Sequence, residues 1–254
     1  MYVVETPLLL ENSSFSIVHV SDLHSVIYGN KQELLIDKIN SLNPDLVLLT
    51  GDIFDDYSPV TGTQLFLAGV SGIAPVYFVT GNHEYRSRRL MEIDDLLKQY
   101  KIQKLSDEYV FVKIGENEIV LAGIEDIFRK IYINSDYDQD SIMETRFREL
   151  DDADNYKILL AHRPERIDSY KRFSFSMILS GHTHGGQIRI PYLINGLFAP
   201  DQGFFPKYGG GLYQHNNLVH IINRGLFIHP MLPRIFNPPE ICFITVKSSK
   251  QEND

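Results

Sequence analysis

The chain of 254 residues has little cysteine, an excess of acidic over basic residues and no long apolar run. Its single cysteine, Cys242, excludes an intramolecular disulfide and a cysteine-based zinc cluster, and leaves the redox compartment open. Lysine and arginine number 24 against 33 aspartate and glutamate residues, which gives a formal net charge of −9. Because binding to nucleic acid relies on clustered cations that neutralise phosphates, this charge argues against nucleic acid as a partner.

The absence of a long apolar run bears on location. Spanning a bilayer takes about 18 or more consecutive apolar residues, and the sequence has no such stretch, so we expect no transmembrane helix. The first ten residues, MYVVETPLLL, lack a basic segment and are interrupted by Glu5, Thr6 and Pro7, so we predict no signal peptide. The expectation is a cytoplasmic or membrane-peripheral protein. The sequence leaves its oligomeric state open.

The composition is that of a globular protein. Hydrophobic residues make up 43% of the chain and charged residues 22%, which excludes wholesale disorder. The length suits one large domain with a sizeable core. We therefore predict a single domain over residues 1–254, with the last strands in 188–246 and a frayed polar tail at 247–254.

Short apolar runs alternate with helical patterns along the chain. The predicted strands are Phe15–Val20, Asp45–Thr50, Pro75–Thr80, Ile119–Ala122, Lys157–Ala161, Phe175–Leu179, Leu218–Ile222 and Ile241–Val246. Residues 32–42 and 88–100 carry leucine and isoleucine at helical spacing. Strands that alternate with helices predict an α/β fold with helices on the sheet faces. The shorter connections late in the chain predict a second sheet or an antiparallel portion.

Five of the predicted strands end in polar clusters. These clusters read SDLH at 21–24, GD at 51–52, GNHE at 81–84, His162 alone, and SGHTHGG at 180–186. Ligands of α/β sheets bind beyond the carboxyl ends of the strands, so we expect the clusters to meet there.

These clusters offer seven candidate metal ligands. They are Asp22, His24, Asp52, Asn82, His162, His182 and His184. One ordinary site needs four to six donors, counting water, so seven suit two ions that share one carboxylate. Oxygen and imidazole donors favour manganese, iron, zinc or cobalt over a thiolate-type site.

The clusters also resemble a known family. SDLH, LTGD, GNHE, LLAH and LSGHTHGGQ, in this order over residues 15–187, are similar to the five motifs of the calcineurin-like metallophosphoesterases. The remainder resembles the bacterial YkuE/YaeI-type phosphodiesterase branch through Ile190-Pro191, the Tyr/Gly-rich stretch 208–213, Arg224-Gly225 and Pro238-Pro239-Glu240. The resemblance implies a four-layer αββα sandwich in which two mixed β-sheets are flanked by helices.

The resemblance also implies a role for each candidate ligand. It gives one divalent ion to Asp22, His24, Asp52 and His184, and the other to Asp52, Asn82, His162 and His182, with Asp52 as the bridge. His83 then faces the substrate, either as acid to the leaving oxygen or as a charge on the phosphoryl group. Glu84 stands where many relatives carry aspartate, and we expect it to hold the His83 ring.

Other polar residues receive less specific interpretations. Asp126 closes a predicted strand and could reach the site behind the ligands. Asp55 and Asp56 are typical of a solvated turn. We interpret His19, His215, His220 and His229 as structural. The aromatic, glycine-rich stretch 192–214 is either a lid or docking surface for a lipid-like substrate, or a loop whose rings fold inward onto the second sheet.

The favoured function is a two-metal phosphoesterase that hydrolyses phosphodiester bonds by attack of a hydroxide held between the ions, with His83 assisting the leaving group. Three alternatives stay open. The chain could hydrolyse a lipid-linked pyrophosphate, because related folds cleave UDP-diacylglucosamine and the aromatic stretch permits such a substrate. It could be a nuclease, against which its charge argues. It could also be a scaffold that keeps the fold without the chemistry, although an intact ligand set and His83 count against that interpretation.

Overall fold

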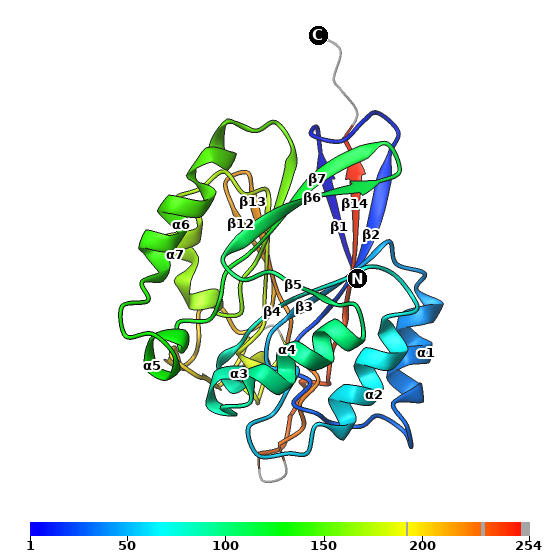
Figure 1. Cartoon of the computed structure of the whole chain (residues 1–254), viewed down its shortest axis with the longest axis vertical. Helices are drawn as coiled ribbons and strands as arrows, with labels where there is room; N and C mark the ends of the chain where they lie inside the picture. The colour runs from blue at the N-terminus through cyan, green and yellow to red at the C-terminus, as the bar shows by residue number, and fades with distance from the viewer. Residues whose placement is uncertain (192, 230–231, 250–254) are drawn as a thin grey trace.

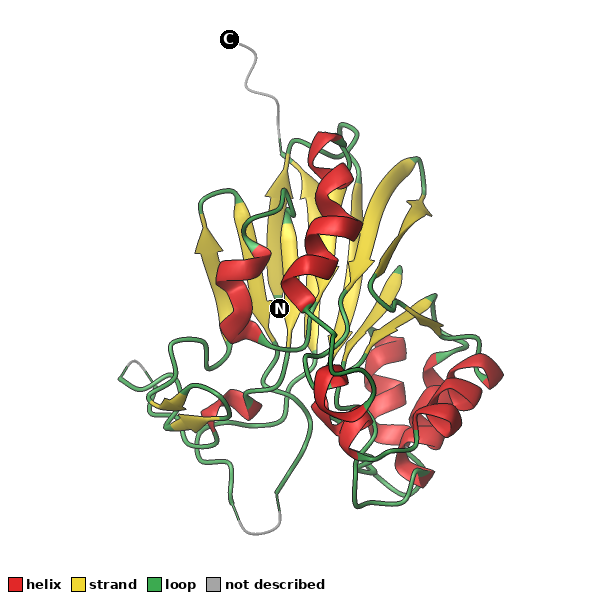
Figure 2. Cartoon of the chain, turned by 60° about the vertical axis from the view of Figure 1, so that its left-hand side comes forward, coloured by secondary structure: helices red, strands yellow, loops and turns green. Residues whose placement is uncertain are grey.

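The computed structural model describes residues 1–191, 193–229 and 232–249. Within them, two six-stranded sheets stack face to face and helices cover both outer faces (Figures 1 and 2). The four-layer αββα architecture is therefore confirmed. No helix in the described parts of the chain is both long enough and apolar enough to cross a bilayer.

The first sheet is mixed. Its order is β1 (Tyr2–Thr6), β14 (Cys242–Ser248), β2 (Ser14–Val20), β3 (Leu46–Thr50), β4 (Val76–Val79) and β5 (Gln103–Lys104). Strands β2 to β5 run parallel, whereas β14 is antiparallel to β2 and parallel to β1. Residues 247 and 248, which we expected in a frayed tail, belong to β14 and pair with β1. The rest of that prediction, at 250–254, lies outside the described residues.

The second sheet is also mixed. Its order is β12 (Gly211–His215), β13 (Leu218–Ile222), β9 (Met177–Ser180), β8 (Tyr156–Leu160), β7 (Asn117–Gly123) and β6 (Glu108–Ile114). The antiparallel portion expected late in the chain is the β12–β13 hairpin at one edge. A short hairpin, β10 (Phe198–Ala199) and β11 (Gly203–Phe204), stands outside both sheets.

Alternate residues of the central strands serve two apolar layers. In β2, Ile17 faces the core between the sheets, whereas Val18 and Val20 face the helices. Such strands are buried on both faces, which explains their continuous apolar runs. All eight predicted strands are present, with their ends shifted by at most two residues.

The helices lie on the two outer faces. The first sheet is covered by α1 (Glu33–Ser41), α2 (Thr61–Val70) and α4 (Leu90–Gln99). The second is covered by α6 (Gln139–Phe147) and α7 (Ile167–Tyr170). Shorter helices, α3 (Asn82–Arg86), α5 (Arg129–Tyr132) and the 3₁₀ turns Arg148–Asp152, Pro164–Arg166 and His184–Gly186, lie in the connections.

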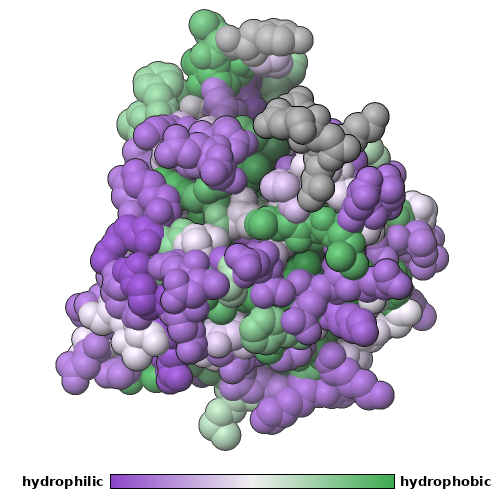
Figure 3. Space-filling view, turned by 90° about the horizontal axis from the view of Figure 1, so that it is seen from above, coloured by the Kyte–Doolittle hydropathy of each residue, from purple (hydrophilic) through white to green (hydrophobic). Residues whose placement is uncertain are grey.

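Parallel strands direct their carboxyl ends to one end of the molecule. Because β14 runs antiparallel to β2, that end lies away from the C-terminus, at the bottom of Figure 1. Figure 3 looks onto the opposite end, where hydrophilic residues cover most of the visible surface and hydrophobic patches lie between them.

Candidate metal centre

The seven predicted ligands meet at the carboxyl ends of five strands. They are Asp22 and His24 after β2, Asp52 after β3, Asn82 after β4, His162 after β8, and His182 and His184 after β9. The first four follow the first sheet and the last three follow the second. All except His184 are buried. The site therefore lies between the two sheets.

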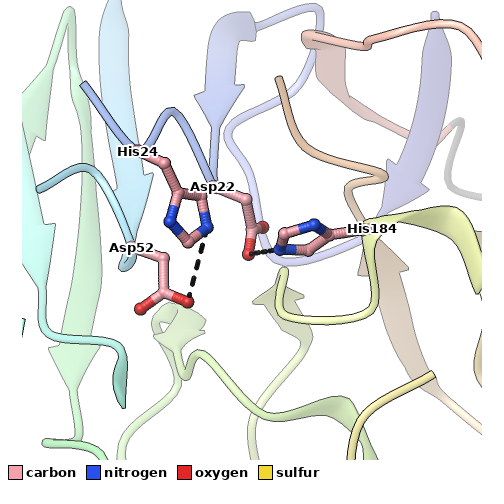
Figure 4. Close-up of side chains that lie close together, drawn as sticks. All are labelled: Asp22, His24, Asp52 and His184. Atoms are coloured by element: carbon pink, nitrogen blue, oxygen red, sulfur yellow. Dashed lines mark ion pairs between the residues drawn. The ribbon is translucent and has the colours of Figure 1, made fainter. Parts of the chain in front are cut away.

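One group of donors consists of Asp22, His24, Asp52 and His184, whose ligand atoms all lie within 4.8 Å of one another (Figure 4). His184 Nε2 is 3.3 Å from Asp22 Oδ1, and His24 Nε2 is 3.8 Å from Asp52 Oδ2. The resemblance assigns these same four residues to one ion.

A second group consists of Asp52, His162 and His182. His162 Nε2 lies 3.2 Å from Asp52 Oδ2 and 3.1 Å from His182 Nδ1. The same Asp52 oxygen is therefore near a histidine of each group, which is the position of a bridging ligand.

Hydrogen bonds to His162 and His182 determine which ring nitrogen of each is available as a metal ligand. Thr50 O lies 2.7 Å from His162 Nδ1 and can only accept, so Nδ1 carries the proton. Asp201 Oδ2 likewise accepts from His182 Nε2 at 2.9 Å. His162 Nε2 and His182 Nδ1 then face each other at 3.1 Å, and a cation between them would take the place of the proton that Asp52 favours on His162 Nε2.

Two buried donor atoms support the same conclusion. Asn82 Oδ1 and His24 Nε2 have no hydrogen-bond partner among the described residues. Buried polar atoms are rarely left unpaired, so these two point to a ligand. With an all-oxygen and imidazole donor set, the residues present fit two divalent ions.

Electrostatics favour positive charge in this site. Burial alone would raise the pKa of Asp52, but the rings of His162 and His83 hold it well below its ordinary value. Burial alone would lower the pKa of His162, yet Asp52 raises it to about 10. The buried carboxylates thus attract a cation.

Glycines allow the loops to approach this closely. A Cβ on Gly181 would lie 1.8 Å from Ser21 Oγ and 2.4 Å from Asp22 Oδ2. A Cβ on Gly81 would lie 2.3 Å from Asp52 Oδ1. Any side chain at either position would push the ligand loops apart.

His83 lies beside the donors, in the first turn of α3. Its ring is 20% exposed, and Nδ1 is 2.7 Å from Asp56 Oδ1. Burial lowers its pKa, but the Asp52 and Asp55 carboxylates outweigh burial and raise the pKa to about 9. Because Asp56 accepts from Nδ1, Nε2 is the nitrogen left for a substrate.

The predicted contact between Glu84 and the His83 ring is wrong. The buried Glu84 carboxylate accepts from the backbone N–H groups of Gly81 at 2.7 Å, Asp52 at 2.9 Å, Ile53 at 2.9 Å and Phe54 at 3.0 Å. Glu84 therefore fixes the loop that carries Asp52. It also caps the N-terminus of α3, because it accepts from the N–H of the N-cap residue Gly81. With four hydrogen bonds accepted, the carboxylate is directed at the backbone and not at the His83 ring.

The interpretation of Asp55 and Asp56 as a solvated turn is also wrong. Their side chains are only 9% and 6% exposed. Asp55 Oδ1 is 3.2 Å from His24 Nδ1, which orients Nε2 of that ring towards Asp52. Asp56 holds His83. Both carboxylates therefore contact site histidines through the ring nitrogen Nδ1. Their position three and four residues after Asp52 of the GD motif was the available signal.

Among the described residues, Asp126 is connected to the candidate ligands only through Arg163. It is buried, and its Oδ2 accepts from Arg163 Nε at 2.7 Å. Arg163 also donates to Asp201, which holds His182. Sequence reasoning missed Arg163 and Asp201, although Arg163 directly follows the ligand His162.

Three of the four remaining histidines are structural, as predicted. His19 and His220 are fully buried, and burial lowers the pKa of each to about 3, so both are neutral. His215 packs against the rings of Tyr208 and His220, which also contact each other. His229 differs, because it lines the cleft over the metal centre.

The donors open into a cleft of about 760 Å³. Besides five of the seven donors and His83, its lining includes Phe128, Phe198, Phe227, Ile228 and Leu232. The Phe227 ring lies 4.5 Å from that of His24 and 5.5 Å from that of His184, between centroids. The cleft is therefore lined both by apolar side chains and by the acidic and histidine side chains of the candidate metal centre.

The aromatic stretch at 192–214 follows both of its interpretations in part. Phe204 and Phe205 are 71% and 64% exposed, whereas Tyr208 is buried against the second sheet. The exposed rings belong to or adjoin the β10–β11 hairpin, whose Phe198 lines the cleft. Tyr192 lies outside the described residues.

Comparisons with known proteins agree with this geometry. The chain is 32% identical over 204 residues to a Bos taurus transmembrane protein with metallophosphoesterase domain, covering 74% of this chain and 45% of that protein. It is 28% identical to the uncharacterized metallophosphoesterase YkuE of Bacillus subtilis, covering 92% and 80%. A dimetal phosphatase structure from Danio rerio is similar with a TM-score of 0.52 and 12% identity, covering 83% and 87%, which shows a shared fold.

A family model described as calcineurin-like phosphoesterase matches residues 15–186. That span contains all seven candidate ligands and His83. The chain thus belongs to the calcineurin-like phosphoesterase family, whose members are metal-dependent.

Proposed function

We propose that this chain is a two-metal phosphoesterase that hydrolyses phosphodiester bonds. The observation that carries the proposal is the place of Asp52, whose Oδ2 lies 3.8 Å from His24 Nε2 and 3.2 Å from His162 Nε2. One carboxylate within reach of both donor groups is what two neighbouring cations require.

Each donor group would hold one ion. Asp22, His24 and His184 would bind the first, His162, His182 and Asn82 the second, and Asp52 both. When bound, two such ions supply Lewis-acid polarisation of the phosphoryl oxygens and a nucleophilic water at neutral pH. Asp55, Asp201 and Thr50 orient the ligand histidines through their outward nitrogens.

His83 would serve the leaving group. It lines the cleft, and Asp56 fixes its ring through Nδ1. Nε2 can then donate a proton to the ester oxygen as the P–O bond breaks. Acid catalysis of this kind contributes roughly 10²–10⁴-fold to rate.

The cleft walls favour a diester over a monoester. A diester carries one negative charge and two organic substituents, whereas a monoester is more strongly anionic. Arg86 and Arg163 are cations that line the cleft, but the carboxylates of Asp56 and Asp126 offset their charges, so the cleft wall adds little net positive charge to balance a second phosphoryl charge. The aromatic walls offer apolar contact to two substituents.

The test is a substrate panel on protein reconstituted with manganese or zinc. We expect turnover of bis-p-nitrophenyl phosphate, less turnover of p-nitrophenyl phosphate, and no activity after chelation. Monoester activity above diester activity would contradict the diester proposal. No turnover of any ester, with metals bound, would favour the scaffold interpretation.

A second candidate is hydrolysis of a lipid-linked pyrophosphate. The observation that favours it is the exposure of Phe204 and Phe205 on the hairpin whose Phe198 lines the cleft. An apolar surface beside a phosphoester site suits an acyl chain or a lipid surface. Activity on detergent-dispersed lipid pyrophosphates, without activity on simple diesters, would favour this candidate.

A further inference from the structure

Arg163 is a buried arginine in the wall of the cleft. It directly follows the candidate ligand His162, at the carboxyl end of β8, and it is 2% exposed. Its guanidinium carbon lies 4.9 Å from the centre of the Phe128 ring, which also lines the cleft. A cation in such a place needs partners for all its donors.

Two of the three guanidinium nitrogens of Arg163 have hydrogen-bond partners. Nε donates to Asp126 Oδ2 at 2.7 Å, and Nη1 donates to Asp201. Nη2 is buried and has no hydrogen-bond partner among the described residues. A buried guanidinium nitrogen without an acceptor costs free energy, so this one points to a missing acceptor.

The guanidinium also lies next to the second donor group. Nη1 is 3.4 Å from His182 Nε2, and both atoms donate to Asp201 Oδ2. The contact is with the outward nitrogen of His182, but Arg163 lines the same cleft as the candidate ligands His182 and Asn82, so a substrate that fills the cleft would reach both. Asp126 and Asp201 fix the arginine in this position before any anion arrives.

We propose that Arg163 binds the phosphoryl group of the substrate, with Nη2 donating to a non-bridging oxygen. The proposal rests on the proposed function, because it takes a phosphoester as the anion. Arginine suits this role because its planar donors match phosphate oxygens. Arg86, in the same wall, has its Nε engaged by Asp56 Oδ2 at 3.1 Å and is more exposed.

A purely structural role would use only two of the three guanidinium nitrogens of Arg163. Holding Asp126 and Asp201 together requires only Nε and Nη1, and both are used. The third nitrogen then contributes nothing to the fold. If it binds phosphate instead, its removal should affect anion binding without affecting the metal content.

The experiment compares Arg163→Gln and Arg163→Lys with wild type, all loaded with manganese. Arg172→Gln is the matched control, because Arg172 forms a surface ion pair with Glu144 away from the cleft. Elemental analysis gives the metal content, and calorimetric titration with inorganic phosphate gives the affinity directly. Steady-state kinetics on a chromogenic diester give KM and kcat.

We expect phosphate affinity to fall about tenfold or more in Arg163→Gln, with unchanged metal content. Arg163→Lys should recover part of the loss, and Arg172→Gln should match wild type. Wild-type phosphate affinity in Arg163→Gln at full metal content would overturn the proposal. If Arg163→Gln loses metal or does not fold, Arg163→Lys decides, and wild-type phosphate affinity there would overturn it equally.

Failure of the proposed function would be distinguishable. A wild-type protein that hydrolyses no ester but binds phosphate through Arg163 would refute the phosphoesterase and keep the anion site. If the protein hydrolyses esters but its phosphate affinity does not depend on Arg163, the phosphoesterase proposal stands and the anion site at Arg163 is refuted.

Discussion

Five of the seven candidate ligands have a left-handed backbone: Asp22, His24, Asp52, His182 and His184 have φ between 48° and 71°. Residues other than glycine pay about 1 kcal/mol or more for this conformation. Such residues persist only where surrounding contacts fix them. Glu84, with its four backbone acceptor contacts, does so for the Asp52 loop. The clustering of this strain at one site is typical of a functional centre.

The sequence could predict only those site residues that closely follow the end of a strand. All seven donors follow buried strands and were found on that basis. Asp55, Asp56 and Asp201 were not, because their side-chain directions depend on loop conformations that have no periodicity. Glu84 was misinterpreted for a related reason. Its side chain turns back along its own loop instead of reaching the neighbouring ring.

His83→Ala tests the role of a single side chain. Because we propose that His83 serves the substrate and not an ion, we expect metal content to stay at the wild-type level. Turnover should fall by about 10²-fold or more. Elemental analysis and kcat on a chromogenic diester measure the two effects. Loss of half the metal would show instead that His83 is a ligand.

At the scale of elements, the burial of a strand determines whether it can be predicted from the sequence. The central strands β3 and β8 are buried throughout and read as continuous apolar runs. The edge strands β1 and β12, by contrast, alternate between exposed and buried or half-buried residues over only five positions each. Neither was predicted, because five alternating residues also suit a loop. Helix α2 was missed since it begins without a side-chain cap or an acidic first turn.

The β10–β11 hairpin provides a prediction at this scale. Phe204 and Phe205 are mostly exposed, so changing both to serine removes little buried area. We expect Tm to fall by less than about 4 °C and turnover of a small diester to stay unchanged. Phe175→Ser, which removes a ring that is 5% exposed, is the destabilising control. A similar loss of Tm in both proteins would show that the hairpin rings support the core.

At the scale of the whole molecule, the candidate metal centre joins the two sheets. Its donors follow β2, β3 and β4 of one sheet and β8 and β9 of the other. Hydrogen bonds across the same boundary, such as the one that His182 N–H donates to the Asp22 carboxylate Oδ2 at 3.0 Å, bring these ends together. Bound ions would therefore stabilise the packing of one sheet on the other. The single-domain organisation remains a prediction.

Metal removal should lower the stability of the whole fold. A ligand at 100 times its Kd stabilises the folded state by about 2.7 kcal/mol, and the buried Asp22 and Asp52 carboxylates lose their counter-charge without it. We expect a chelator to lower Tm by about 5–10 °C and manganese to restore it. Thermal denaturation followed by circular dichroism measures this shift. An unchanged Tm in protein shown to be metal-free would contradict a centre that joins the sheets.

The shared carboxylate is the central claim, and metal stoichiometry tests it most directly. Substituting Asn for Asp52 keeps the shape but removes the negative charge between two dications, so both sites should weaken together. Asp22→Asn, which alters a donor of one group alone, should mainly weaken one site. The measurement is a titration of wild type and both variants with manganese, followed by calorimetry and elemental analysis. We expect two ions in wild type and loss of both from Asp52→Asn at the same metal concentration. An Asp52→Asn protein that binds two ions with wild-type affinity would contradict it.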